Sequence, residues 1–155
     1  MRGRQNDTLY LSGSNFLPNK SFDLFTIQRT ELLANAQTDP NFTNFGQAWY
    51  QTDLDTDAYG SFNGTIKTII LDQIFGFDPD ANLVPTQALH VGFWFDNPND
   101  AAACGFNVNK ATPFNGQHLA GPNAMISLPD ATTDLGPVCT VPILENGAYA
   151  CNINK

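Results

Sequence analysis

Short segments in which apolar and polar residues alternate with a period of two constrain this chain more than any other feature. The stretches GSFNGTIKTIIL, residues 60–71, and QALHVGFWFD, residues 87–96, both place successive side chains on opposite faces, as half-buried strands do. Turn-forming Gly, Pro, Asn and Asp residues separate such segments. Glutamate, a good helix former, occurs only at Glu31 and Glu145. The pattern predicts many short strands and no helix long enough to connect parallel neighbours.

Further strand candidates and the turns between them predict an all-β fold. These candidates are residues 8–12, 21–28, 46–52, 123–128 and 137–144. The stretch 97–122 is rich in Gly and Pro and has little periodicity, which indicates a long loop insertion. We therefore expect one domain, residues 1–155, that folds as an antiparallel β-sandwich of seven to eight strands.

Two turn-containing stretches resemble the pattern of bacterial secreted Ig-like modules. LSGSNFLPNKSFDLF supplies a strand, a Gly-x-x-Phe-x-Pro turn and a second strand, and TDAYGSFNGTI follows later as a hairpin. The resemblance covers about residues 8–70 and implies an Ig-like sandwich in which Asp57 caps a turn and Gly60 has a positive φ. It implies little about activity. The matching positions are Gly13, Phe16, Pro18, Thr56, Asp57, Gly60, Phe62 and Gly64.

The stretch TDLDTDAYGSFNGT permits a second interpretation beside the turn. Asp53, Asp55 and Asp57 alternate, so they could present three carboxylates to Ca²⁺, as the first half of an EF-hand loop does. That loop has Gly at its sixth position and Glu at its twelfth, where this chain has Ala58 and Gly64. A calcium site and a plain turn both stay open, and we expect no other cofactor.

The three cysteines predict a disulfide rather than a zinc site. Cys104, Cys139 and Cys151 have no CxxC spacing and no histidine at metal-ligand spacing. We expect one disulfide and one odd thiol. All three pairings stay open, and the candidate that we name, Cys104–Cys139, would close a loop of 35 residues. Three reduced thiols are the alternative.

Several weak signals favour an extracellular or cell-surface location. No apolar run approaches the length of a membrane span, and the first residues lack the apolar core of a signal peptide. We therefore expect a mature or reconstructed chain, and a cytosolic protein is the alternative. Four Asn-x-Ser/Thr sequons could carry glycans: Asn6, Asn19, Asn41 and Asn63.

The charge distribution argues against nucleic acid as a partner and sets a basic N-terminus apart from an acidic body. The net charge is −8, but residues 1–30 carry four basic residues against two aspartates. An acidic body repels phosphate backbones. A basic arm, residues 1–12, could dock on a neighbouring copy as a donated strand through Thr8, Leu9, Tyr10 and Leu11, and a solvated, frayed end is the alternative.

No catalytic arrangement is recognisable, so we do not expect an enzyme. His90 and His118 belong to no nucleophile, zinc or general-base motif. The exposed aromatic residues of a carbohydrate-binding platform could be Trp49, Tyr50, Tyr59 and Trp94, although such residues also fill the core of a sandwich.

These observations favour an extracellular structural or assembly module, a subunit of a filament, surface layer or adhesin that forms a homo-oligomer or polymer by strand donation. The alternative is a carbohydrate-binding module that uses a Trp/Tyr face.

Overall fold

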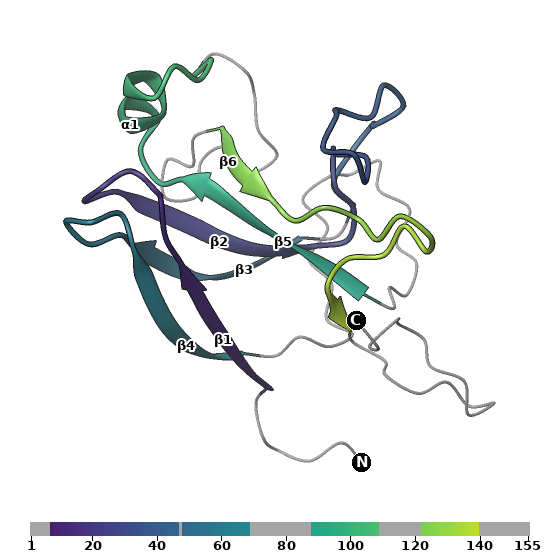
Figure 1. Cartoon of the computed structure of the whole chain (residues 1–155), viewed down its shortest axis with the longest axis horizontal. Helices are drawn as coiled ribbons and strands as arrows, with labels where there is room; N and C mark the ends of the chain where they lie inside the picture. The colour runs from purple at the N-terminus through teal and green to yellow at the C-terminus, as the bar shows by residue number, and fades with distance from the viewer. Residues whose placement is uncertain (1–6, 47, 69–87, 109–121, 140–155) are drawn as a thin grey trace.

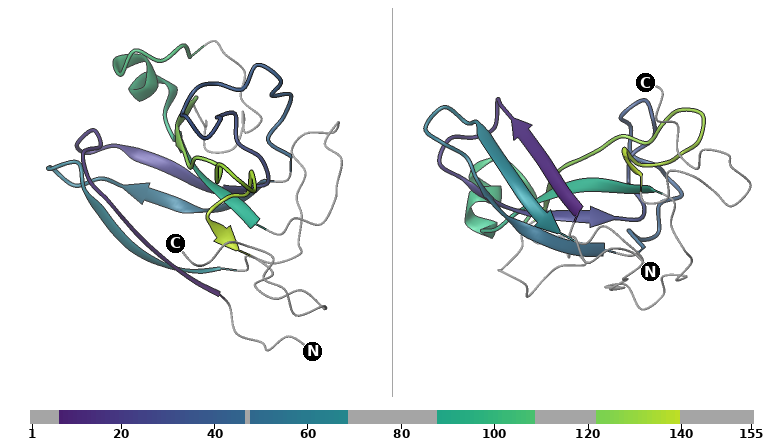
Figure 2. Two further views of the ribbon diagram at one scale, coloured as in Figure 1. Left: turned by 45° about the vertical axis from the view of Figure 1, so that its right-hand side comes forward. Right: turned by 90° about the horizontal axis from the view of Figure 1, so that it is seen from below.

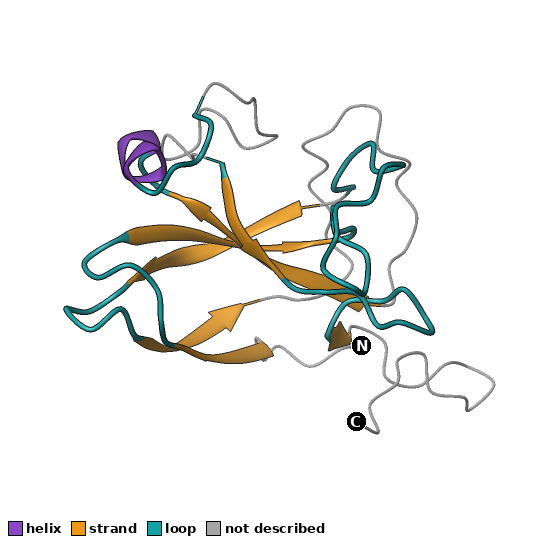
Figure 3. Cartoon of the chain, turned by 45° about the horizontal axis from the view of Figure 1, so that its top comes forward, coloured by secondary structure: helices purple, strands orange, loops and turns teal. Residues whose placement is uncertain are grey.

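The computed structural model of the chain describes residues 7–46, 48–68, 88–108 and 122–139 (Figure 1). Within these residues the regular secondary structure is almost entirely strand, with one short helix (Figure 3). The elements are β1 (Asp7–Gly13), β2 (Ser21–Ile27), β3 (Ala48–Asp55), β4 (Phe62–Thr68), β5 (Ala88–Phe95), α1 (Pro98–Ala103), β6 (Asn123–Ile126) and β7 (Val138–Cys139).

The described strands form two antiparallel sheets. β1 pairs with β4 in the smaller sheet, and the larger sheet has the order β3-β2-β5-β6, with β7 also paired with β5. Every described pairing is antiparallel. The expected all-β class is confirmed.

Two apolar clusters cover opposite faces of the larger sheet. On one face, β2 and β5 residues pack against the β1–β4 pair, which lies over this face in Figure 2. On the other face, the segment between β2 and β3 covers Phe25, Ile27 and Trp94 with Phe45 and Phe42. β5 is consequently buried on both faces, whereas its alternation indicated a half-buried strand. The first cluster includes Phe22, Leu24, Leu54, Phe93 and Phe95, with Leu9, Leu11, Phe16, Phe62 and Ile66 packed against it.

The β1–β2 and β3–β4 turns are tied together at one end of the molecule. Phe16 N–H donates to the Gly60 carbonyl oxygen at 3.0 Å. Gly60 has φ +70°, and a Cβ at Gly60 would lie 2.0 Å from the carbonyl oxygen of Phe16. Asp57 Oδ1 accepts from the backbone N–H groups of Tyr59 and Ser61, at 2.8 and 2.9 Å. The expected turn, with Asp57 as its cap and a positive φ at Gly60, is present.

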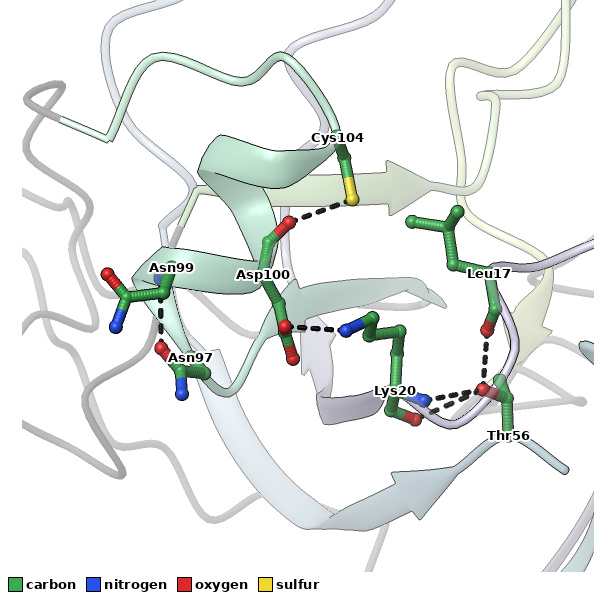
Figure 4. A network of polar contacts seen from close by, with 7 residues as sticks. All are labelled: Leu17, Lys20, Thr56, Asn97, Asn99, Asp100 and Cys104. Atoms are coloured by element: carbon green, nitrogen blue, oxygen red, sulfur yellow. Dashed lines mark hydrogen bonds and ion pairs between the residues drawn. The ribbon is translucent and has the colours of Figure 1, made fainter. Parts of the chain in front are cut away.

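The stretch 97–122 is not entirely a loop, because its first part forms α1. Asn97 caps this helix by accepting from Asn99 N–H at 2.9 Å, and Pro98 occupies the first turn, where its missing N–H has no cost. Lys20 Nζ contacts Asp100 Oδ1 at 2.6 Å and so joins α1 to the start of β2 (Figure 4).

The expected Cys104–Cys139 disulfide is not formed. Cys104 is a free thiol whose Sγ donates to the Asp100 carbonyl oxygen at 2.8 Å (Figure 4). Cys139 pairs with Ala88 at the start of β5, and Cys104 follows the other end of that strand. Eight residues of strand span about 25 Å, far beyond the Cα separation of about 7 Å that a disulfide allows.

Replacement of Gly60 tests the junction between the two turns. We expect Gly60→Ala to lower the free energy of unfolding by more than Gly105→Ala, as measured by denaturant titration. Gly105 also has a positive φ, +84°, but a Cβ there would meet nothing within 4 Å. Gly105→Ala should therefore lose only about 1–2 kcal/mol for the left-handed backbone. Equal losses in the two variants would contradict the close approach of Gly60 to Phe16.

Candidate functional site

Three aspartates from three neighbouring strands meet on one face of the larger sheet. Asp23 in β2 lies opposite Asp53 in β3 and, on its other side, opposite Trp94 in β5. Asp96 follows two residues after Trp94, so it projects from the same face. One carboxylate oxygen from each aspartate lies within 4.8 Å of those of the other two. We call Asp23, Asp53 and Asp96 the aspartate cluster.

Burial within the aspartate cluster decreases from the centre of the sheet outwards. Asp23 is 0% exposed, Asp96 is half-buried and Asp53 is exposed. Neither carboxylate oxygen of Asp23 has a hydrogen-bond partner. The Tyr50 hydroxyl donates to Asp53 Oδ1 at 2.7 Å. The aspartate cluster thus joins a fully buried, unpartnered carboxylate to one that solvent reaches.

Burial and like charge together favour a neutral Asp23. Burial raises the pKa of the Asp23 carboxyl to about 7, with further contributions from the neighbouring Asp53 and Asp96. Burial also raises the pKa of Tyr50 above its ordinary value, and Asp53 adds to the effect. Tyr50 therefore stays a hydrogen-bond donor at neutral pH. An ionised Asp23 is stable in this position only if a positively charged group compensates its negative charge.

Of the three aspartates expected to bind calcium, only Asp53 belongs to this group. Asp55 accepts a hydrogen bond from Ser21 Oγ, and Asp57 accepts from the backbone of its own turn. Sequence reasoning missed Asp23 and Asp96 because their proximity to Asp53 depends on strand pairing. The available signal was Asp23 itself, a charged residue inside the apolar run FDLFTI.

The four expected ligand-face aromatics do not share one exposed face. Trp94 is completely buried, in edge contact with Phe25 at a ring-centroid distance of 5.3 Å. Trp49 and Tyr50 are adjacent residues of β3, so they point to opposite faces of the sheet. Tyr59 is 88% exposed in the β3–β4 turn.

His90 is buried in β5, with Nδ1 at 3.2 Å from both the carbonyl oxygen and Oγ of Ser127. Burial lowers the pKa of His90. This surrounding fits a neutral histidine that links β5 to the chain after β6. His118 lies outside the described residues.

The remaining expected sites lie on the surface or in β1. Of the four sequons, Asn19, Asn41 and Asn63 are exposed, and Asn6 lies outside the described residues. In the expected assembly arm, Thr8 and Tyr10 are exposed and the leucines beside them are half-buried. The glycans and the arm stay predictions.

Comparison with known proteins finds no match among family models, curated proteins or solved structures. In the described part of the chain, no helix has the length and apolar character needed to cross a membrane.

Replacement of the buried acid tests the electrostatics of the aspartate cluster. The folded-state pKa of Asp23, about 7, lies above the ordinary value of 3.8, so the unfolded chain loses this proton first as pH rises. Asp23 therefore lowers the free energy of unfolding progressively between about pH 4 and 7, by at most about 1.4 kcal/mol per pH unit. Asp23→Asn removes this loss. We expect the variant to be the more stable protein at pH 8 in EDTA.

The measurement is the difference between the two unfolding free energies as a function of pH. His90 acts in the opposite direction. Because its pKa is lowered in the folded state, the free energy of unfolding decreases as the pH drops below 6.5, the ordinary pKa of histidine. His90 is present in both proteins, so its contribution cancels in the difference. Asp53, Asp96 and Tyr50 are the titratable groups that face Asp23. Parallel curves for the two proteins would contradict the raised pKa.

Proposed function

We propose that this chain is an extracellular structural or assembly module with an Ig-like sandwich fold, and that its copies associate through β1. The basis is the edge of β1, which in the described part of the chain has one strand neighbour, β4. The Ig-like assignment draws support from the turn positions, since Asp57 caps its turn and Gly60 has a positive φ, as the turn pattern implies.

The carrying observation is that the β1 edge lacks the usual protection against strand pairing. Among the edge strands that the structure describes, β3 has exposed Asp53 and Asp55, β4 has exposed Lys67, and β6 is only 4 residues long. Charges and short lengths of this kind prevent edge pairing. β1 has one charged residue, Asp7, at its first position, and the segment TLYLSG that follows contains no charge and no proline, with Tyr10 76% exposed on it.

A second copy of this chain fits that edge. In an antiparallel pair centred on Tyr10, the two tyrosines lie opposite one another and Thr8 lies opposite Ser12. The leucines of β1 stay against their own core. Charge also favours an antiparallel arrangement of the two copies of β1. The sequence places Arg2 and Arg4 just before this strand. Antiparallel pairing brings the start of β1 in one copy to Gly13 of the other, and the β1–β2 turn that follows Gly13 lies beside the β3–β4 turn and its Asp57.

This contact is symmetric, so it closes as a dimer, and a filament or surface layer would need a second contact between dimers. The intramolecular pairing of β1 with β4 makes this an addition at an edge rather than an exchange of strands. The extracellular setting is supported by three exposed sequons, Asn19, Asn41 and Asn63.

Tyr10→Lys tests association through β1. In the symmetric pair it would place two lysines directly opposite one another, where like charges are destabilising. We expect light scattering to give at least a dimer for the native chain and about a tenfold weaker association for Tyr10→Lys, which corresponds to about 1.4 kcal/mol. Negative-stain images should show whether dimers assemble further.

Tyr59→Lys is the matched control, because Tyr59 is equally available to solvent but lies in the β3–β4 turn. It should associate as the native chain does, and both variants should keep the native unfolding free energy at concentrations where all three proteins are monomeric. A native chain that stays monomeric at its highest soluble concentration, with residues 1–13 intact, would refute the proposal.

A further inference from the structure

The aspartate cluster has the donor chemistry of a hard-cation site. Carboxylate oxygens are the preferred ligands of Ca²⁺, which binds six to eight oxygens at about 2.3–2.6 Å. Two oxygens bound to the same Ca²⁺ ion can therefore be up to about 5 Å apart. The three oxygens of Asp23, Asp53 and Asp96 meet this limit, since all lie within 4.8 Å of one another.

Asp23 gives an independent reason to expect an ion. A fully buried, ionised carboxylate with neither oxygen hydrogen-bonded is destabilising unless a proton or a cation neutralises it. The basic side chains that flank β2 have other partners, because Lys20, just before its start, contacts Asp100, and Arg29, beyond its far end, donates to Asn44 Oδ1 at 2.8 Å. One of these two oxygens lies within 4.8 Å of a carboxylate oxygen of Asp53 and of one of Asp96.

We propose that Asp23, Asp53 and Asp96 bind one Ca²⁺ ion, which crosslinks β2, β3 and the end of β5. Exposed Asp53 opens the site to solvent, and water molecules complete the coordination there. Strand pairing holds the carboxylates at fixed positions, and Ca²⁺ accepts irregular, mono- or bidentate arrangements that Mg²⁺, with its strict octahedral geometry, does not. We therefore expect Ca²⁺ to bind in preference to Mg²⁺.

Direct titration of the purified, EDTA-treated chain with Ca²⁺ tests the proposal. We expect one ion per chain with a dissociation constant of about 10⁻⁴ M, in the range of extracellular calcium modules. About 10 mM Ca²⁺, roughly 100 times that constant, should raise the melting temperature by about 5–10 °C. Terbium in place of calcium should luminesce on excitation of the protein, because Tyr50 and Trp94 adjoin the aspartate cluster.

Asp23→Asn and Asp53→Asn are the test variants, and Asp55→Asn is the matched control two residues along the same strand. The first should abolish the calcium response and the second should weaken binding at least about tenfold, since each removes a charged ligand. Asp55→Asn should bind as the native chain does, because Asp55 contacts Ser21 instead. Circular dichroism verifies that each variant is folded.

Three results would overturn the proposal. One is no binding heat and no change in melting temperature for the native chain. Another is an equal response of the native chain and Asp23→Asn, which would indicate nonspecific binding. The third is loss of binding in Asp55→Asn with retention in Asp23→Asn, which would assign the ion to Asp53, Asp55 and Asp57. Tyr10→Lys should bind Ca²⁺ as the native chain does, so the calcium site and the β1 contact are tested independently.

Discussion

The structure depends on β2 being covered on both of its faces. Phe22 and Leu24 pack toward the β1–β4 pair, and Phe25 and Ile27 pack under the segment that leads to β3. A strand in this position is well suited to apolar side chains on each face, which is how most of β2 reads. Asp23 is the exception, because it occupies an interior position between Asp53 and Trp94. The apolar packing that stabilises the sheet is also what removes water from this carboxylate.

The two proposed sites belong to different faces and different sheets. The aspartate cluster projects from the face of the larger sheet that carries Trp94, while β1 lies over the opposite face. An ion at Asp23 would therefore hold β2, β3 and β5 together without touching β1, the strand through which we propose that copies associate. Contacts of Lys20 and Thr56 hold the start of β2 independently of both sites. Lys20 contacts α1, and Thr56 Oγ1 donates to the Leu17 carbonyl oxygen at 2.6 Å (Figure 4).

Local features could be predicted from the sequence, and features that depend on strand pairing could not. The turn at Asp57 and Gly60 is encoded within five residues, so its cap and its positive φ were predictable. α1 also had local signals, an Asn cap followed by Pro and an alanine run, but the Gly- and Pro-rich composition after it masked them. The aspartate cluster needed the pairing of Asp23 with Asp53, and the burial of Trp94 needed the cover supplied by the segment between β2 and β3. Neither follows from periodicity, because alternation defines two faces without saying what covers them.

The distribution of the aspartate cluster along the chain has a consequence for how the domain folds. Asp23 and Asp53 are 30 residues apart and lie in strands that follow one another, whereas Asp96 comes 73 residues after Asp23. Closing the shorter loop costs less chain entropy, so the β2–β3 hairpin can form while Asp23 is still hydrated. Arrival of β5 then desolvates this carboxylate and brings Asp96 beside it. The electrostatic penalty of the aspartate cluster thus arises only when β5 pairs with β2, and a proton on Asp23 reduces it.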